Sequence, residues 1–354
     1  MSVQSITDYS LVHATVRALY SAMLSPEEWD ALVQTQDFDA LANALSKTAY
    51  GSTLILKDLT PRRAVHQVRR HLTALYEKVI RLTPEPSRQL LLWMWRLYEV
   101  DNLKATLRGI ETGAAWSQVL FLLYPMPRHA VLTAADMEKM VQSGSVARAI
   151  ELTRHTPYYE TLSHALERYE EEKSLFPLEV ALDLDYGRGL WQSINQLGGL
   201  DYEQGLRIVG SWLDMHNLLW AIRYRVYHHL SEQEIINYTL PFGYQVHDRD
   251  IRAIAAGADI GQVVRRIYKN VTEAERISEQ TGAGLGTFEA ALQRRLTAVC
   301  RATFIGYPFH IGIPAAFLVL NEYEIKDLTV LIEAKASRLP AEAFTSMLVM
   351  QPSA

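Results

Sequence analysis

One polar pattern occurs three times along this 354-residue chain, and it constrains the fold more than any other feature. In each copy an acidic residue is followed three positions later by Asn or Asp and then Leu. Leu or Ile comes four positions after that Leu, directly before a charged residue. The copies are Glu99–Arg108, Asp214–Arg223 and Glu324–Glu333, and they start 115 and 110 residues apart. Because solenoid repeats are about 20–50 residues long, this longer spacing predicts three related domains.

Helical spacing places the acid, the amide and the first Leu of each copy on one face. The stretches before the copies are apolar, at 90–97, 206–213 and 311–320, which is typical of helices buried on most sides. A buried polar group without a partner costs about 1–3 kcal/mol, so we expect each acid and amide to bind a neighbouring helix or loop. The predicted structural core consists of Glu99, Asn102, Leu103, Arg108, Asp214, Asn217, Leu218, Arg223, Glu324, Asp327 and Leu328.

A carboxylate cluster for metal binding or catalysis is the alternative interpretation of the same pattern. The third copy argues against it, because Asp327 stands in the place of Asn102 and Glu333 in the place of Arg108. A packing scaffold can compensate such changes more readily than a reactive centre can. We therefore favour a structural role for the pattern.

A second marker repeats with nearly the same period. Residues 29–33 correspond to 137–141 and 251–255, and residues 45–50 correspond to 153–158. The two markers together predict an all-α chain of three similar helical domains, with boundaries at 1–115, 116–230 and 231–354.

Capping sequences indicate where several helices begin. Ser25-Pro-Glu-Glu28, Thr133-Ala-Ala-Asp136 and Ser231-Glu-Gln-Glu234 each place an acid three residues after a Ser or Thr. We expect a helix to start after each of these residues.

Composition excludes several classes of protein. The net charge of −5 and a pI near 6.1 disfavour a nucleic-acid binder, which usually carries a basic excess. Cys300 is the only cysteine, so one chain can form neither a disulfide nor a cysteine zinc site. The longest apolar run, 305–320, contains prolines and is shorter than the roughly 20 residues that span a bilayer. We expect no direct membrane span and interpret this run as a buried loop and helix.

No convincing catalytic, cofactor or metal site is present in the sequence. His155, His164 and the acids of 170–172 fit no zinc spacing, and 183–189 lacks the order of a calcium loop. The glycines of 282–286 lack the preceding strand of a dinucleotide site, and no phosphate loop with Gly-Lys-Ser/Thr occurs. We therefore predict no catalytic residues, no cofactor and no metal.

A basic run remains open to two interpretations. It contains Arg62, Arg63, His66, Arg69, Arg70 and His71. It is either a docking patch for an acidic partner or the solvated face of a helix, and the solvated face is favoured.

The repeated residues resemble the connector of V- and A-type rotary ATPases, which is the C subunit in prokaryotes and the d subunit in eukaryotes. The resemblance covers most of the chain and includes the opening stretch 9–19, the helix end 45–51 and the final stretch 321–335. It implies an all-helical funnel with pseudo-threefold symmetry. Its wide mouth would receive the rotor shaft, and its narrow end would sit on the membrane proteolipid ring.

The role implied by this resemblance is that of a non-catalytic connector. It would transmit torque between ATP hydrolysis or synthesis and the transport of protons or sodium ions. The implied partners are the central shaft subunits and the proteolipid ring, with the stator membrane subunit as a further candidate and no nucleic acid. The implied location is cytoplasmic, peripheral on the membrane through the ATPase membrane sector. A helical scaffold of another assembly and an all-helical enzyme remain as alternatives.

Overall fold

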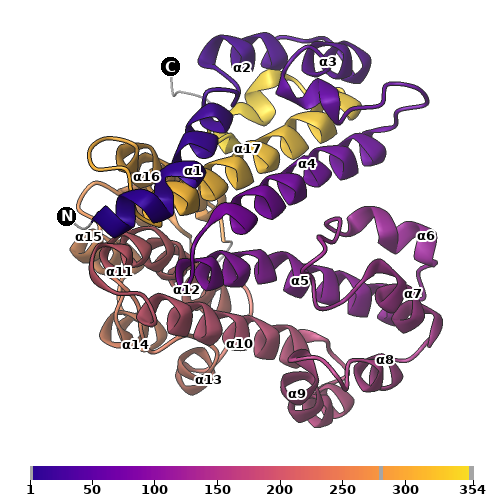
Figure 1. Ribbon diagram of the computed structural model, residues 1–354. Coiled ribbons are helices and arrows are strands. Elements are labelled where there is room, and N and C mark those ends of the chain that lie inside the picture. Colours follow the sequence, from indigo (N-terminus) through magenta and orange to yellow (C-terminus); the bar gives the residue numbers. More distant parts are fainter. Residues whose placement is uncertain (1–2, 279–281, 351–354) are drawn as a thin grey trace.

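The computed structural model describes residues 3–278 and 282–350, and within these ranges it contains helices and no strand (Figure 1). The all-α prediction is therefore confirmed. The helices are α1 (Val3–Tyr20), α2 (Pro26–Val33), α3 (Phe38–Leu45), α4 (Pro61–Leu82), α5 (Ser87–Glu111), α6 (Trp116–Val119), α7 (Ala134–Gln142), α8 (Val146–Leu152), α9 (Tyr158–Glu172), α10 (Phe176–Asn195), α11 (Gly199–Gly205), α12 (Ser211–Val226), α13 (Glu232–Asn237), α14 (Asp248–Ala255), α15 (Ile260–Ile267), α16 (Leu285–Thr303) and α17 (Gly312–Ala336).

The three capping sequences start helices as predicted. Ser25 Oγ accepts from the Glu28 amide at 3.2 Å, and a Glu28 carboxylate oxygen accepts from the Ser25 amide at 2.8 Å. The same reciprocal pair forms at Thr133 before α7 and at Ser231 before α13. Each pair satisfies backbone donors that have no partner inside the helix, which fixes the position of the helix start.

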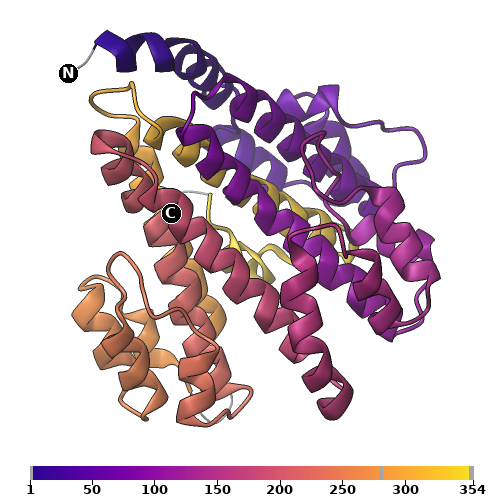
Figure 2. The ribbon, with the colours of Figure 1, turned by 60° about the horizontal axis from the view of Figure 1, so that its bottom comes forward.

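Long helices pack in pairs to form the body of the molecule. The helix α17 lies beside α4, and α5 lies beside α10 (Figures 1 and 2). A glycine permits the close approach of α5 and α10. A Cβ atom at Gly189 of α10 would lie 2.0 Å from the indole ring of Trp93 on α5, so no other residue fits without displacement of that ring.

One carboxylate connects segments that are far apart in the sequence. Asp201 of α11 accepts hydrogen bonds from the Tyr9 hydroxyl of α1 at 2.7 Å and from the backbone amide of Ile311 at 2.8 Å. Ser87, at the start of α5, donates to the same carboxylate at 3.3 Å. These bonds hold the starts of α5 and α17 against α11.

The structure differs from the sequence prediction at two places. The segment Leu206–Gly210, predicted as part of a regular helix, forms a π-helical turn between α11 and α12. Gly210 lies there against Tyr244, whose Cβ would be 2.9 Å from a Cβ at position 210. The run 305–320 is buried only in part, because Ile305 is 83% exposed whereas α17 is almost entirely buried from its first residue.

No helix within the described ranges is long and apolar enough to cross a membrane.

Candidate functional site

The three copies of the polar pattern lie on the three helices α5, α12 and α17, and their acids and amides are almost fully buried. Glu99, Asp214 and Glu324 are each 1% exposed. The following Leu residues, Leu103, Leu218 and Leu328, are fully buried. Each acid and amide reaches a backbone segment outside its own helix.

The Asn or Asp of each copy binds the backbone of a segment 22 or 23 residues further along the chain. Asn102 donates to the Tyr124 carbonyl at 2.9 Å and accepts from the Tyr124 amide at 2.7 Å. Asn217 makes the same pair of bonds with Leu240, at 2.8 and 2.7 Å. An Asn side chain suits this role because its amide group offers one donor and one acceptor side by side.

The third copy uses a different set of donors at the equivalent place. Asp327 has no N–H, and its carboxylate instead accepts from two consecutive backbone amides, Val349 at 2.8 Å and Met350 at 2.6 Å. The segment bound is again 22 and 23 residues away. The replacement of Asn by Asp is thus matched by a segment that presents two donors. Burial raises the pKa of Asp327 to about 6, against the opposing effect of these two amides.

The acid of the first and third copies binds one backbone amide and one tyrosine hydroxyl. Glu99 accepts from the Tyr158 hydroxyl at 2.5 Å and from the Val131 amide at 3.2 Å. Glu324 accepts from the Tyr50 hydroxyl at 2.7 Å and from the Leu24 amide at 3.0 Å. Sequence reasoning did not assign this role to either tyrosine. The signal was present, because both end the second repeated marker.

The third copy therefore reaches back to the beginning of the chain. Glu324 lies 300 residues after Leu24, whereas Glu99 binds residues that follow it.

Burial raises the pKa of Glu324 to about 7 and that of Asp214 to about 6, and it also raises the pKa of Glu99. Asp214 binds the backbone amides of Tyr244 at 2.7 Å and Gln245 at 2.6 Å and no tyrosine hydroxyl within the described ranges.

The charged residue that ends each copy lies at the surface rather than in the core. Arg108 forms a bidentate pair with Glu179 of α10, at 2.6 and 2.8 Å, although its side chain is 61% exposed. Arg223 pairs with Glu289 of α16 at 2.5 Å. Glu333, in the third copy, is exposed.

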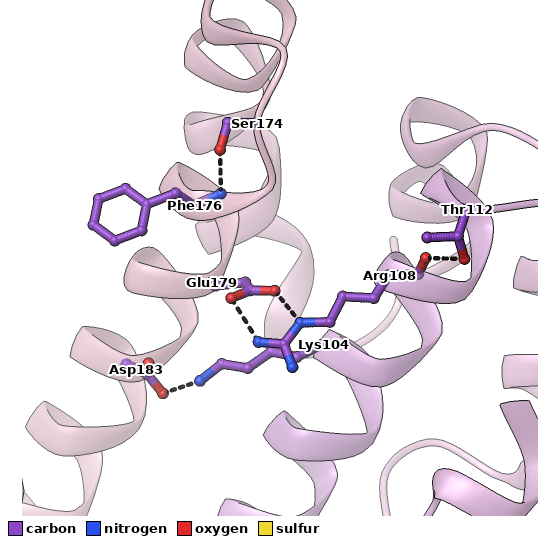
Figure 3. A network of polar contacts seen from close by, with 7 residues as sticks. All are labelled: Lys104, Arg108, Thr112, Ser174, Phe176, Glu179 and Asp183. Carbon is purple, nitrogen blue, oxygen red and sulfur yellow. Dashed lines mark hydrogen bonds and ion pairs between the residues drawn. The ribbon is translucent and has the colours of Figure 1, made fainter. Parts of the chain in front are cut away.

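Further charged side chains extend the network between α5 and α10 (Figure 3). Lys104 lies one turn before Arg108 and pairs with Asp183, which lies one turn after Glu179. Asp101 is next to this network, and burial raises its pKa to about 6 while Lys104 opposes the shift. In these two ion pairs α5 thus contributes the cations and α10 the carboxylates.

A partly buried carboxyl group lies among aromatic side chains near the network. Glu322 of α17 lines a small cavity with Tyr76, Tyr186 and Trp212. Burial raises the pKa of Glu322 to about 7, with Lys326 opposing the shift. The cavity is lined mainly by apolar atoms from five helices and the π turn, which is the composition of a packed core rather than of a reactive site.

The structure describes no candidate metal site, since no group of three potential ligands forms within residues 3–278 and 282–350. Asp183 and Asp185, in the stretch that lacks the order of a calcium loop, lie within α10. The glycines Gly282 and Gly284 have positive φ and precede α16, so they form the turn before that helix.

Comparison with known proteins places these residues in a family. The family model described as "ATP synthase (C/AC39) subunit" matches residues 12–347. The C subunit of the A-type ATP synthase of Methanocaldococcus jannaschii is 23% identical over 355 residues, covering 98% of this chain and 88% of the relative. The corresponding protein of Methanothermobacter thermautotrophicus is 24% identical, covering 92% and 84%. That of Methanobrevibacter smithii is 25% identical, covering 94% and 85%. Because the family match spans nearly the whole sequence, the chain belongs to the ATP synthase (C/AC39) subunit family.

Proposed function

We propose that this protein is the non-catalytic central-stalk connector of a V/A-type rotary ATPase. In this role it joins the rotor shaft to the membrane proteolipid ring and transmits torque between them. Its partners are then the other subunits of that complex, and it associates with the membrane through them. Family membership supports a place in the ATP synthase, and the internal repetition supports the mechanical role.

The observation that carries the proposal is the repeated bonding of an Asn or Asp to a backbone segment 22 or 23 residues away. It occurs at Asn102, Asn217 and Asp327. Torque transmission requires a body that does not deform under load. Buried polar groups with specific partners favour one arrangement of packed helices, because any other arrangement leaves them unsatisfied.

We further propose that the chain consists of three units with boundaries near residues 115 and 230, arranged as a funnel with pseudo-threefold symmetry. The last long helix of each unit contacts a short helix pair of the following unit: α5 contacts α7–α8, and α12 lies near α14 and α15. In the same way α17, of the third unit, contacts the α2–α3 pair of the first. The bonds from Glu324 to Leu24 and Tyr50 support a closed arrangement, because they join the last unit to the first.

The surface proposed to receive the shaft is the charged network on the C-terminal halves of the long helices. It includes Lys104 and Arg108 with their partners on α10, and Arg223 and Lys326 around Glu289. The side chains of Arg108, Arg223 and Lys326 are about half exposed and can exchange an internal partner for an external one at small net cost, since surface ion pairs contribute only about 0–1 kcal/mol.

The test is an affinity purification of the tagged full-length chain from its native membranes in mild detergent. The connector role predicts that the ATPase head, the shaft and the proteolipid ring co-purify in fixed proportion. Recovery of the chain without these subunits, under conditions that keep the remaining complex intact, would contradict it.

A further inference from the structure

Helix α4 concentrates positive charge in a chain that is acidic as a whole. The net charge of the chain is −5, whereas α4 contains five arginines, one lysine and a single acid, Glu77. The basic run recognised in the sequence forms the first half of this helix. A local excess of positive charge creates a surface potential that attracts acidic partners.

Part of this charge lies on one exposed side of the helix, here called the α4 outer face. It consists of Arg63, Arg70, Ala74 and Arg81, which are separated by seven, four and seven residues and are all exposed. These spacings keep the four residues on one side of a helix. The face extends over about 27 Å at the rise of an α-helix. The opposite side of α4, which includes Val68 and Leu72, is buried.

The arginines of this face are not neutralised by acids of the described chain. Arg70 and Arg81 form no ion pair within residues 3–278 and 282–350, and Arg63 donates to the carbonyl oxygen of Asp58 at 3.0 Å. Glu77 lies beside the face and accepts from the backbone amide of Arg128 at 2.8 Å.

Two exposed arginines on other helices are paired along their own helix. Arg168 of α9 pairs with Glu172, and Arg252 of α14 pairs with Asp248, both four residues apart. On α4 the single acid, Glu77, lies four residues before Arg81, but no ion pair joins the two within the described residues. The unbalanced charge thus distinguishes α4 from these helices.

Exposed apolar side chains adjoin the N-terminal half of α4. Ile55 is 58% exposed, Leu56 43% and Leu122 56%. Two hydrogen bonds fix them next to the helix: the Ile55 amide donates to Gln67 at 2.8 Å, and Arg69 donates to the Leu122 carbonyl at 2.6 Å. Arginine is enriched at protein–protein interfaces, and the buried centre of such an interface is apolar.

We propose that the α4 outer face, together with Ile55, Leu56 and Leu122, binds an acidic amphipathic helix of a partner protein. Carboxylates of that helix pair with Arg63, Arg70 and Arg81, and its apolar side chains cover the three aliphatic residues. The predominance of arginine favours carboxylates held in the bidentate manner. The proposal does not depend on the connector role, since it concerns a separate surface.

The experiment places a photo-reactive phenylalanine analogue at Ala74, the uncharged centre of the face, in the full chain within its native membranes. The matched control carries the same analogue at Ala135, an exposed alanine of α7. After irradiation, the cross-linked peptides are identified by mass spectrometry. A second sample carries the analogue together with Arg63→Glu, Arg70→Glu and Arg81→Glu. Its charge-matched counterpart carries the analogue with Lys47→Glu, Arg148→Glu and Lys269→Glu, at exposed positions elsewhere.

The proposal predicts an adduct at position 74 with a segment rich in Asp and Glu. The adduct is lost in the triple reversal on α4 and is retained in the charge-matched counterpart. Circular dichroism of both triple variants checks that they fold. An adduct with lipid alone, an adduct with a neutral or basic segment, or no adduct above that at Ala135 would each overturn it.

Discussion

The substitution Asn217→Leu tests the role of the repeated amides most sharply. It keeps the side-chain shape and removes both hydrogen bonds to Leu240, which are 2.8 and 2.7 Å long. Asn217 and Leu240 are each 1% exposed, so water cannot replace the lost partner without a rearrangement. A buried backbone donor or acceptor left unsatisfied costs about 1–3 kcal/mol. For the two groups of Leu240 we expect a loss of about 2–5 kcal/mol in the free energy of unfolding.

The assay is equilibrium unfolding in urea, read by circular dichroism, with Asn43→Leu as the matched control. Asn43 is exposed on α3 and donates to the Asp39 carbonyl within its own helix. We expect that control to change the free energy of unfolding by no more than about 0.5 kcal/mol. If Asn217→Leu were as stable as the control, the reasoning about the buried amides would be refuted.

A further measurement separates stability from binding. The free energy with which folded Asn217→Leu binds its assembly should change less than its free energy of unfolding does, because Asn217 is buried inside the chain and is not exposed to a partner. Unchanged unfolding together with abolished assembly would instead place Asn217 in an interface.

Three other predictions concern the buried acids and the exposed pairs. Tyr158→Phe should lower the free energy of unfolding by about 1.5–3 kcal/mol, because the hydroxyl bonds the buried carboxylate of Glu99; Tyr159→Phe, whose hydroxyl bonds an exposed acid, should change it little in the same urea titration. Glu322→Gln should gain stability relative to the unmodified protein as pH rises from about 4.5 to 7. Burial raises the pKa of Glu322 to about 7 in the folded state, so ionisation in that interval opposes folding, and a pH series of unfolding curves without this gain would contradict the assignment. Arg108→Ala should cost at most about 1 kcal/mol, since the Arg108 side chain is 61% exposed in its pair with Glu179, and a larger loss by calorimetry would show that the pair is part of the core.

The sequence predicted local features of the fold well where short-range chemistry decides them. The capping residues Ser25, Thr133 and Ser231 start helices as expected, because each cap bonds within its own first turn. The π turn at Leu206–Gly210 was not predicted. Its last residue, Gly210, packs against Tyr244, a tertiary contact that no local pattern encodes.

The sequence indicated that the repeated polar residues have buried partners, but it did not show which residues those partners are. The burial of Glu99 and Asn102 followed from their apolar surroundings, which implied partners. The identity of the partners depends on the folded path of the chain, as with Tyr50, which lies 274 residues before Glu324. The repeated marker places Tyr50 and Tyr158 at equivalent positions, but only the structure shows which acid each hydroxyl bonds. The exposure of Ile305 was missed because an apolar run was assumed to be buried throughout.

The most direct test of the connector role is a cryo-EM map of the complete ATPase purified through a tag on this chain. The connector role predicts that the chain lies on the rotor axis, with the shaft on one side and the proteolipid ring on the other. It also predicts that the charged residues Lys104, Arg108 and Arg223 face the shaft. A map that places the chain off the rotor axis, or that shows shaft and ring in contact without it, would contradict this role.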